Sequence, residues 1–380
     1  MKIVLAGGGS GGHFYPLIAV TEALEDISKE KKLIEPQVFY IGPEPFDKTS
    51  IMEHEITYLP GAAGKLRRYP SLLNVFGLFK TFFGIISSTL RLFKLYPDIV
   101  FSTGGFAAFP TLWAARILGI PVVIYDADAR PGRVSLWSAR FARWIAVAHP
   151  DAAGQFPKQY LAKIARIGHP IRHELEAPAR EGGHEFLKLD PAVRTVLIMG
   201  GSSGAQTIND TLLDALPTLL EHYNIVHQTG IANIEEVKNI TSVVLKNSRY
   251  AERYRPFGLL NILALRMAAG IASVVVSRAG SGTIFEIASW GTPSILIPIP
   301  TEISHDQTEN AFSYARAGAA TVLEQRNLTP HLLVAEIDRM MNDPNLHASM
   351  SEAAKIFARP EAARKIAEII IETALTHEPV

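Results

Sequence analysis

The chain has 380 residues, of which 48% are apolar and 19% are charged, and none is cysteine. The length predicts two or three domains, the apolar fraction excludes a disordered protein, and the lack of cysteine excludes disulfides, thiolate metal sites and cysteine nucleophiles. The net charge of zero argues against nucleic acid as the main partner. The two halves of the chain carry opposite net charges that cancel. Residues 1–170 hold 19 basic and 13 acidic side chains, whereas residues 171–380 hold 18 basic and 24 acidic side chains.

Short apolar runs in the first half predict buried strands, each followed by a helical pattern. These runs cover residues 2–8, 37–42, 98–105, 121–128 and 144–150. Such alternation is typical of parallel sheets built from βαβ units. Only four apolar residues, Ile3–Ala6, precede the first glycines, which is too short for the core of a signal peptide.

The strand pattern restarts after a charged, glycine-containing break at residues 180–184. The second set of predicted strands covers residues 195–201, 223–230, 273–280 and 293–300. Residues 2–12 and 195–205 both place an apolar strand before a glycine loop and a helix, so we expect an α/β protein with two Rossmann-like domains facing across a cleft. A last helix is predicted over residues 360–375, with an apolar stripe of Ala363, Ile366, Ala367 and Ile370.

Residues 72–93 form one long apolar stretch, interrupted by Lys80 and Arg91. Its length is marginal for a membrane span, and the charges count against one. Two interpretations stay open: a helix packed inside the protein, or a helix on an anionic membrane surface. The second is favoured by the basic residues that punctuate the segment 65–94, namely Lys65, Arg67, Arg68, Lys80, Arg91 and Lys94.

Three glycine loops follow predicted strands, at residues 7–12, 102–106 and 200–205. Backbone N–H groups in such loops bind anions at helix N-termini. The first loop fits the dinucleotide pattern G-x-G-x-x-G, but the acidic residue expected after the second strand is missing, which disfavours a dehydrogenase. His13 follows this loop and is either a catalytic base or a residue that bonds a neighbouring loop.

Two acidic motifs also have competing interpretations. Glu286 lies three residues after Thr283, a spacing that suits either a helix capping box or a carboxylate that accepts the hydroxyls of a ribose. Asp126 and Asp128 form D-x-D, a pattern that in other folds holds a divalent metal between phosphates. We interpret that match as coincidental, because the glycine loops already supply a phosphate site.

Seven motifs occur together in the order and spacing of one family. They are GGGSGGH (7–13), STGGF (102–106), IPVV followed by D-x-x-P-G (128–132), GHPIR (168–172), GGSSGA (200–205), SRAG with Glu286, and DQTENA (306–311). Over nearly its whole length the chain resembles the MurG family of bacterial cell-wall glycosyltransferases. The resemblance implies a GT-B fold with a lipid-acceptor and membrane-facing domain (1–170 plus the helix 358–380) and a UDP-sugar domain (171–357).

The resemblance also implies residue roles. His13 would be the base, with Asp128 as the competing candidate, and Gly104, Gly105 and Asp128 would line the acceptor. Donor and UDP contacts would come from Ser10, Gly11, Gly12, Arg172, Ser202, Ser203, Gly204, Arg278, Glu286 and Gln307. The chain departs from the family at residues 125–128, Tyr-Asp-Ala-Asp in place of H-E-Q-N or H-E-S-D, and at residues 305–307, His-Asp-Gln in place of D-H-Q.

The implied activity is inverting transfer of N-acetylglucosamine from UDP-N-acetylglucosamine to the C4 hydroxyl of undecaprenyl-pyrophosphoryl-N-acetylmuramyl-pentapeptide. Leaving-group charge would be held by the third glycine loop and Arg172, so a divalent cation is allowed but no cofactor or metal is required. The implied location is the cytoplasmic face of the bacterial membrane, peripherally bound, where other cell-wall synthesis proteins are conceivable partners. Competing activities are a related transferase acting on a diacylglycerol or small aglycone, and a UDP-N-acetylglucosamine 2-epimerase.

Overall fold

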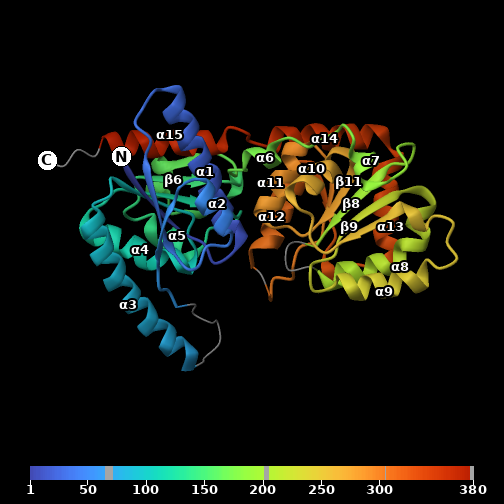
Figure 1. The fold of residues 1–380 in the computed structure, drawn as a ribbon, viewed down its shortest axis with the longest axis horizontal. Coiled ribbons are helices and arrows are strands. Elements are labelled where there is room, and N and C mark those ends of the chain that lie inside the picture. The colour runs from blue at the N-terminus through green and yellow to red at the C-terminus, as the bar shows by residue number, and fades with distance from the viewer. Residues whose placement is uncertain (65–71, 201–204, 304, 377–380) are drawn as a thin grey trace. The chain divides into compact units, whose positions relative to one another are not determined.

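The chain forms two compact units in the computed structural model, which describes residues 1–64, 72–200, 205–303 and 305–376 (Figure 1). The first unit comprises Met1–His173 with Arg359–Val380, and the second comprises Glu174–Ala358. The boundary between the units lies after residue 173, three residues later than the expected domain boundary after residue 170. The return to the first unit lies after residue 358, one residue later than expected. Arg172 therefore belongs to the first unit.

The first unit is built on seven parallel strands in the order β3-β2-β1-β4-β5-β6-β7. Their bounds are β1 (Lys2–Ala6), β2 (Gln37–Gly42), β3 (Thr57–Pro60), β4 (Ile99–Ser102), β5 (Val122–Asp126), β6 (Trp144–Val147) and β7 (Ile164–Arg166). The five predicted strands are confirmed. The strands β3 and β7 were not predicted, because each is a short edge strand without a continuous buried run.

Helices cover both faces of this sheet. They are α1 (Gly11–Glu30), α2 (Lys48–Glu53), α3 (Leu72–Leu95), α4 (Gly105–Leu118), α5 (Arg133–Ser138) and α15 (Ala362–Leu375), with 3-10 helices η1 (Pro150–Gln155) and η2 (Lys158–Lys163). Helices α1 and α15 pack together on one face, and α3 and α4 pack together on the other (Figure 1). The predicted apolar stripe of α15 is confirmed, since Ala363, Ile366, Ala367 and Ile370 are buried.

The second unit has six parallel strands in the order β10-β9-β8-β11-β12-β13. They are β8 (Thr195–Met199), β9 (Asn224–Gln228), β10 (Tyr254–Phe257), β11 (Ala272–Ser277), β12 (Ser294–Leu296) and β13 (Ala320–Val322). The four predicted strands are confirmed, and the edge strands β10 and β13 were missed. Both sheets therefore share the arrangement that the repeated strand-glycine-helix pattern predicted.

The helices of the second unit also form two layers. They are α6 (His173–Glu176), α7 (Gly183–Leu187), α8 (Gln206–His222), α9 (Ile234–Val244), α10 (Ile262–Ile271), α11 (Ser281–Trp290), α12 (His305–Arg316), α13 (Pro330–Asn342) and α14 (Pro344–Phe357), with η3 (Ala251–Arg253) and η4 (Gln325–Asn327). Helix α8 packs on α9 and α13, whereas α11 packs on α12 and α14. A large buried cluster lies between the sheet and α8 and α13.

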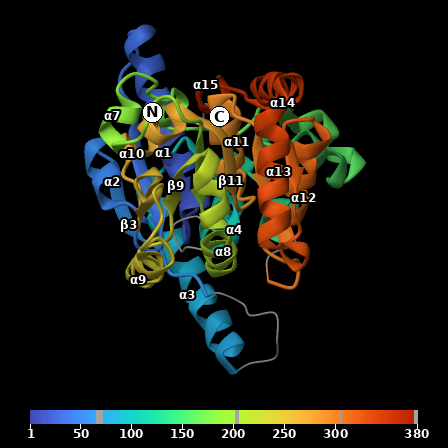
Figure 2. The same ribbon diagram turned by 90° about the vertical axis from the view of Figure 1, so that its right-hand side faces the viewer.

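Helix α3 exposes most of its large apolar side chains and packs against the protein through a narrow face of two glycines, a serine and one leucine. Gly77, Gly84, Ser88 and Leu92 face the protein. The exposed apolar residues are Val75, Phe76, Leu78, Phe79, Phe82, Phe83, Ile86, Leu90 and Phe93. One end of the helix extends beyond the rest of its unit (Figure 2). By length and composition Val75–Leu95 can cross a membrane, and only 22% of its apolar window is buried, so the interpretation as an internal helix is wrong.

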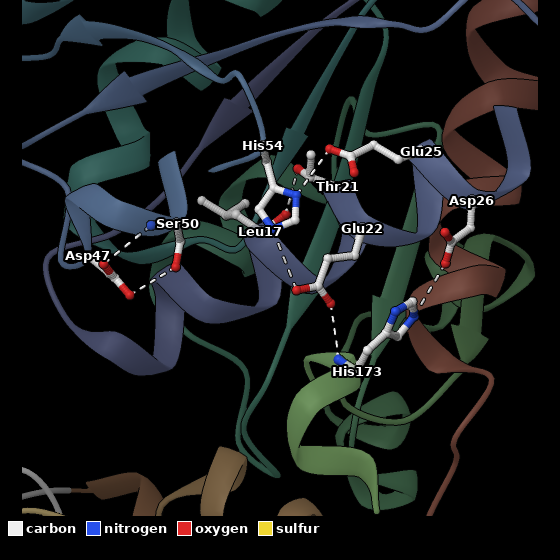
Figure 3. A network of polar contacts seen from close by, with 9 residues as sticks. All are labelled: Leu17, Thr21, Glu22, Glu25, Asp26, Asp47, Ser50, His54 and His173. Atoms are coloured by element: carbon white, nitrogen blue, oxygen red, sulfur yellow. Dashed lines mark hydrogen bonds and ion pairs between the residues drawn. The ribbon is translucent and has the colours of Figure 1, made fainter. Parts of the chain in front are cut away.

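A cluster of charged side chains links α1 to α2 and to His173, the last residue of the segment Met1–His173 of the first unit (Figure 3). The ring of His54 contacts Glu25 at 3.1 Å and Glu22 at 3.6 Å. Glu22 also accepts the backbone N–H of His173 at 3.1 Å, and the His173 ring lies 3.5 Å from Asp26. Hydrogen bonds to Glu22 and Glu25 raise the pKa of His54 to about 10. Although burial opposes ionisation of Glu22, its bonds to the two histidines lower its pKa.

Candidate functional site

The strand order of each sheet reverses direction at one point, between β1 and β4 in the first unit and between β8 and β11 in the second. Open α/β sheets bind ligands beside the carboxyl ends of the strands at this reversal. The first and second glycine loops follow β1 and β4, so they meet at the reversal point of the first unit. The third glycine loop follows β8 at the reversal point of the second unit.

His13 is the third residue of α1, and its ring is held by the second glycine loop. Its Nδ1 atom lies 2.8 Å from the carbonyl oxygen of Thr103, and the Thr103 hydroxyl donates to the carbonyl oxygen of His13 at 2.6 Å. A carbonyl oxygen only accepts hydrogen bonds, so Nδ1 carries a proton, and in the neutral imidazole the lone pair is on Nε2. The predicted bond to a neighbouring loop is thus confirmed, and it leaves the other ring nitrogen able to accept a proton.

The two loop glycines beside His13 have backbone conformations that suit glycine. Gly104 and Gly105 both have φ of +74°, in the region that L-residues with a side chain rarely adopt. A Cβ atom on Gly105 would lie 3.4 Å from Nε2 of His13. This glycine therefore leaves room for the imidazole edge that holds the lone pair.

The first glycine loop opens α1. Ser10 is the N-cap residue, and its carbonyl oxygen accepts the N–H groups of His13 and Phe14. Gly11 and Gly12 occupy the first turn, where Gly12 is exposed and a Cβ atom on it would meet no atom within 4 Å. The loop thus presents an open helix N-terminus, the feature expected of an anion-binding site.

Asp126 ends strand β5 and is 5% exposed. Its carboxylate accepts the backbone N–H of Gly132 at 3.0 Å and that of Asp128 at 3.2 Å. Burial raises its pKa, against the opposing effects of a hydrogen bond from Ser135, the two backbone bonds and the charge of His13. Asp126 thus organises the loop that carries the half-buried Asp128. It was not among the predicted site residues.

Tyr125, which stands where many family members have histidine, is fully buried behind the site. Its hydroxyl lies 2.7 Å from Nδ1 of His169, the histidine of the GHPIR motif. Burial lowers the pKa of His169 to about 3, so this ring is neutral. The substitution at position 125 is therefore accommodated in the core by a hydrogen bond between two uncharged side chains.

Arg172 of the GHPIR motif lies over an aromatic ring at the start of α1. Its guanidinium carbon is 3.9 Å from the ring centroid of Tyr15, a short cation–π distance. The Tyr15 ring also packs edge-on against Phe46 and sits beside Gly11. Arg172 is therefore placed next to the first glycine loop of its own unit.

The expected donor residues of the second unit fall into two groups. Ser202, Ser203 and Gly204 lie outside the described residues. Arg278 follows β11 and donates to the carbonyl oxygens of Ile297 at 3.0 Å and Pro298 at 3.4 Å. Its guanidinium therefore braces the loop after β12.

Gln307 on α12 is bonded to the same two loops. Its Oε1 atom accepts the N–H of Ile299 at 3.1 Å and that of Ala279 at 3.3 Å. Backbone N–H donors require the carbonyl oxygen, so the amide orientation is set and the Nε2 group remains to donate. The structure thus brings Arg278 and Gln307 together at the carboxyl ends of β11 and β12.

Glu286 lies in the second turn of α11, half-buried. The helix begins at Ser281 with Gly280 as its N-cap, and no side chain caps it. Thr283 is therefore already inside the helix, and the capping-box interpretation is wrong. The alternative interpretation, in which the Glu286 carboxylate accepts the hydroxyls of a ribose, stays a prediction.

Comparisons with known proteins agree with this geometry. Models of the glycosyltransferase family 28 N-terminal and C-terminal domains match residues 3–147 and 195–366. A UDP-N-acetylglucosamine--N-acetylmuramyl-(pentapeptide) pyrophosphoryl-undecaprenol N-acetylglucosamine transferase of Treponema denticola is 33% identical, over 95% of this chain and 93% of that protein. The crystal structure of Acinetobacter baumannii MurG matches with a TM-score of 0.73 and 25% identity, covering 98% of this chain and 99% of that one. The chain belongs to the MurG family of glycosyltransferases.

The MurG fold is shared more widely than the MurG activity. The structure of S. aureus MnaA with UDP matches this chain with a TM-score of 0.71 at 15% identity, covering 100% of this chain and 99% of that one. A likeness at that identity concerns the fold alone. It is the sequence relation to the MurG transferases that separates this chain from the other activities considered for it.

Two MurG site features in this chain had little or no signal in the sequence. The backbone carbonyl of Thr103 positions His13. Because every residue has such a carbonyl, the sequence cannot reveal which one forms this bond. Asp126 was visible only as part of D-x-D, and the two backbone N–H groups that bind it become evident only once β5 and its following loop are placed. An acidic residue within an otherwise apolar predicted strand was the available clue.

Proposed function

We infer that this protein transfers N-acetylglucosamine from UDP-N-acetylglucosamine to the C4 hydroxyl of undecaprenyl-pyrophosphoryl-N-acetylmuramyl-pentapeptide, a step of peptidoglycan synthesis. The observation that carries this inference is the His13 ring, fixed by Thr103 with its Nε2 lone pair beside Gly105. A neutral imidazole in this tautomer is suited to accept the proton of an attacking hydroxyl. The MurG membership supplies the substrates.

In the proposed reaction, Nε2 of His13 takes the proton from the acceptor C4 hydroxyl. The oxygen attacks the anomeric carbon of N-acetylglucosamine, the bond from that carbon to the UDP oxygen breaks, and UDP leaves as an anion. A single displacement inverts the anomeric centre and needs no covalent intermediate. The buried Asp126 carboxylate would stabilise the imidazolium that forms, while Asp128 is the competing base.

The donor site we propose lies in the second unit. The amide Nε2 of Gln307 would donate to a sugar hydroxyl, and Glu286 would accept the ribose hydroxyls. Leaving-group charge would be held by backbone N–H groups of the third glycine loop, which includes the predicted Ser202, Ser203 and Gly204. Arg172, predicted to bind the same charge, belongs to the first unit. Arg278 holds the loop that binds Gln307. These groups provide electrostatic stabilisation without requiring a metal ion.

We also propose that α3 binds the cytoplasmic face of the bacterial membrane. Its exposed phenylalanines would enter the lipid, while Lys80 and Lys94 would contact anionic headgroups. The predicted Lys65, Arg67 and Arg68 lie outside the described residues. Protein contacts hold the other side of the helix, because the N–H of Gly64 donates to Thr81 at 3.1 Å. This arrangement favours a helix lying on the surface over one that crosses it.

The activity is tested by incubating the protein with radiolabelled UDP-N-acetylglucosamine and candidate acceptors. We expect label in the polyprenyl-pyrophosphoryl disaccharide and none in a diacylglycerol. Label transferred only to diacylglycerol or a small aglycone would support the related transferase instead. Conversion of the donor sugar to its 2-epimer without any acceptor would support an epimerase, and either result would overturn the proposal.

A further inference from the structure

The segment 168–173 of the GHPIR motif is anchored in the core at its start and ends at the boundary of the first unit. His169 and Ile171 are both buried. The chain passes into the second unit directly after His173. Arg172 is half-buried and lies one residue before that boundary, so the core of the first unit supports the segment on one side of Arg172 only.

Glu22 of α1 holds the other end of this segment (Figure 3). Its carboxylate accepts the backbone N–H of His173 at 3.1 Å. His173 is the first residue of α6, so this N–H has no partner inside its own helix. The Glu22 side chain is only 13% exposed, and a hydrogen bond to a charged carboxylate is stronger than one between neutral groups. Glu22 thus fixes the backbone one residue beyond Arg172.

Two further side chains support this bond to different degrees. The ring of His173 lies 3.5 Å from Asp26, but the two side chains are 52% and 53% exposed, so solvent weakens that ion pair. The ring of His54 lies 3.6 Å from Glu22. Hydrogen bonds to Glu22 and Glu25 raise the pKa of His54 to about 10, so His54 is a cation at neutral pH. That cation keeps Glu22 ionised and restricts its orientation.

Helix α1 also holds the side chain of Arg172. The guanidinium carbon of Arg172 lies 3.9 Å from the ring centroid of Tyr15. Tyr15 and Glu22 are seven residues apart, which is two turns of α1, so both lie on the same face of the helix. A ring contact uses the flat face of the guanidinium, which leaves the N–H groups at its edge to donate to an anion.

We propose that Glu22 is a positioning residue for Arg172. By holding the backbone of His173, it keeps the guanidinium against Tyr15 in the orientation that binds the diphosphate of UDP-N-acetylglucosamine. This rests on the proposed function, in which Arg172 binds the leaving-group charge. An arginine loses much rotamer freedom when it binds, and a side chain that is already ordered loses less. Because His13 belongs to the same helix, α1 would position both the proposed base and this phosphate ligand.

The test compares the full-length E22A variant with the matched control E25A. Glu25 lies on the same helix, is half-buried as Glu22 is, and contacts His54; in the described part of the chain its carboxylate forms no bond to His173. E22Q is the conservative variant, because its amide oxygen can still accept the N–H of His173. Calorimetry measures the affinity for UDP and, by competition, that for uridine, which lacks the diphosphate. Urea denaturation confirms that each variant is folded.

We expect E22A to bind UDP about three- to tenfold more weakly than E25A does, and E22Q to bind it within about twofold of E25A. Loss of the guanidinium in R172Q should weaken UDP binding by about tenfold or more. Adding E22A to R172Q should change the affinity by less than about twofold, because the side chain that Glu22 positions is gone. Affinity for uridine should stay the same in every variant, a result that general damage to the fold would not produce.

Three results would overturn the positioning role: equal affinities of E22A and E25A for UDP, a loss in E22A that extends to uridine, or a loss that persists in full when R172Q is already present. If R172Q itself binds UDP as tightly as wild type does, Arg172 does not bind the leaving group. The phosphate contact of the proposed function then fails, and the positioning role fails with it. R172Q therefore tells the two failures apart.

Discussion

The Nδ1 atom of His13 is 2.8 Å from the carbonyl oxygen of Thr103, although 90 residues separate them in the chain. This hydrogen bond joins the helix after β1 to the loop after β4 and determines which ring nitrogen carries the proton. It gives the site one group with a defined orientation and a free lone pair. The first prediction concerns that group.

Replacing His13 with alanine should lower kcat by about 100- to 10,000-fold, the usual contribution of a general base. The KM for UDP-N-acetylglucosamine should change little, because His13 is not among the proposed donor contacts. Steady-state kinetics measure both values. The exposed His331 provides a control substitution on α13. If H13A keeps near-wild-type turnover while D128N loses it, Asp128 is the base.

Replacing Asp126 with asparagine should lower kcat through His13. If the carboxylate acts by stabilising the protonated imidazole, the two losses are not additive, and H13A/D126N should be only slightly slower than H13A. Independent effects would instead multiply. Because two backbone N–H groups bond this carboxylate, we also expect the free energy of unfolding to fall by about 1–3 kcal/mol.

Replacing Gln307 with glutamate tests the donor site. Glutamate retains an oxygen for the N–H groups of Ala279 and Ile299 but loses the NH2 donor. We expect the affinity for UDP-N-acetylglucosamine to fall by about tenfold, the value of one lost hydrogen bond. The affinity for UDP, measured by calorimetry, should fall less because UDP lacks the sugar. An equal loss for both ligands would argue against a contact with the sugar.

Replacing Phe82 with serine tests the membrane face of α3. Phe82 is 60% exposed, and burying a phenylalanine in lipid is worth about 1.5–3 kcal/mol. We therefore expect vesicle binding to weaken by roughly tenfold to a hundredfold. Phe186, 46% exposed on the second unit, provides the control substitution. Flotation in which F82S and F186S behave alike would contradict the proposed orientation.

Replacing His54 with glutamine should change how stability depends on pH. The pKa of His54 rises from 6.5 to about 10 on folding, so its contribution is complete below pH 6.5 and is lost as the pH rises to about 10. The pKa of Glu22 is lowered from 4.5, so that contribution is lost as the pH falls through the folded value.

The loss of unfolding free energy in H54Q, about 1 kcal/mol after solvent screening, should therefore be largest between pH 4.5 and 6.5 and should shrink toward pH 10. Urea denaturation across this range measures it. The exposed pair of Lys48 and Glu44 provides a control, because K48Q should show no measurable loss. A pH-independent loss in H54Q would show that packing, and not charge, is responsible.

The central strands could be predicted because they are buried on both faces. Strand β4, for example, is buried at every residue, and its first three residues are apolar. Strand β3 was missed because its four residues are exposed or half-buried, so its sequence resembles that of a loop. Pairing with β2 makes it a strand, and a single-sequence pattern contains no information about such a partner.

The candidate site was predictable only in part, for a similar reason. The glycine loops and His13 form local patterns that a sequence displays. The tautomer of His13 depends on the Thr103 carbonyl, and the role of Asp126 depends on the loop folding back to place Gly132 beside it. Those relations are created by tertiary structure. The outward face of α3 was undecided for the same reason, because its apolar residues suited either a core or a lipid.

Helix α15 has a consequence for the order in which the protein folds. It packs on α1, and Ile366, Ala367 and Ile370 are fully buried in the first unit. The strands and α1 of that unit are synthesised first, but their apolar face stays uncovered until residues 362–375 leave the ribosome. The second unit, which is contiguous from 174 to 358, can close its core earlier. The part of the chain made first is therefore completed last, and until then it exposes apolar surface that is prone to aggregation.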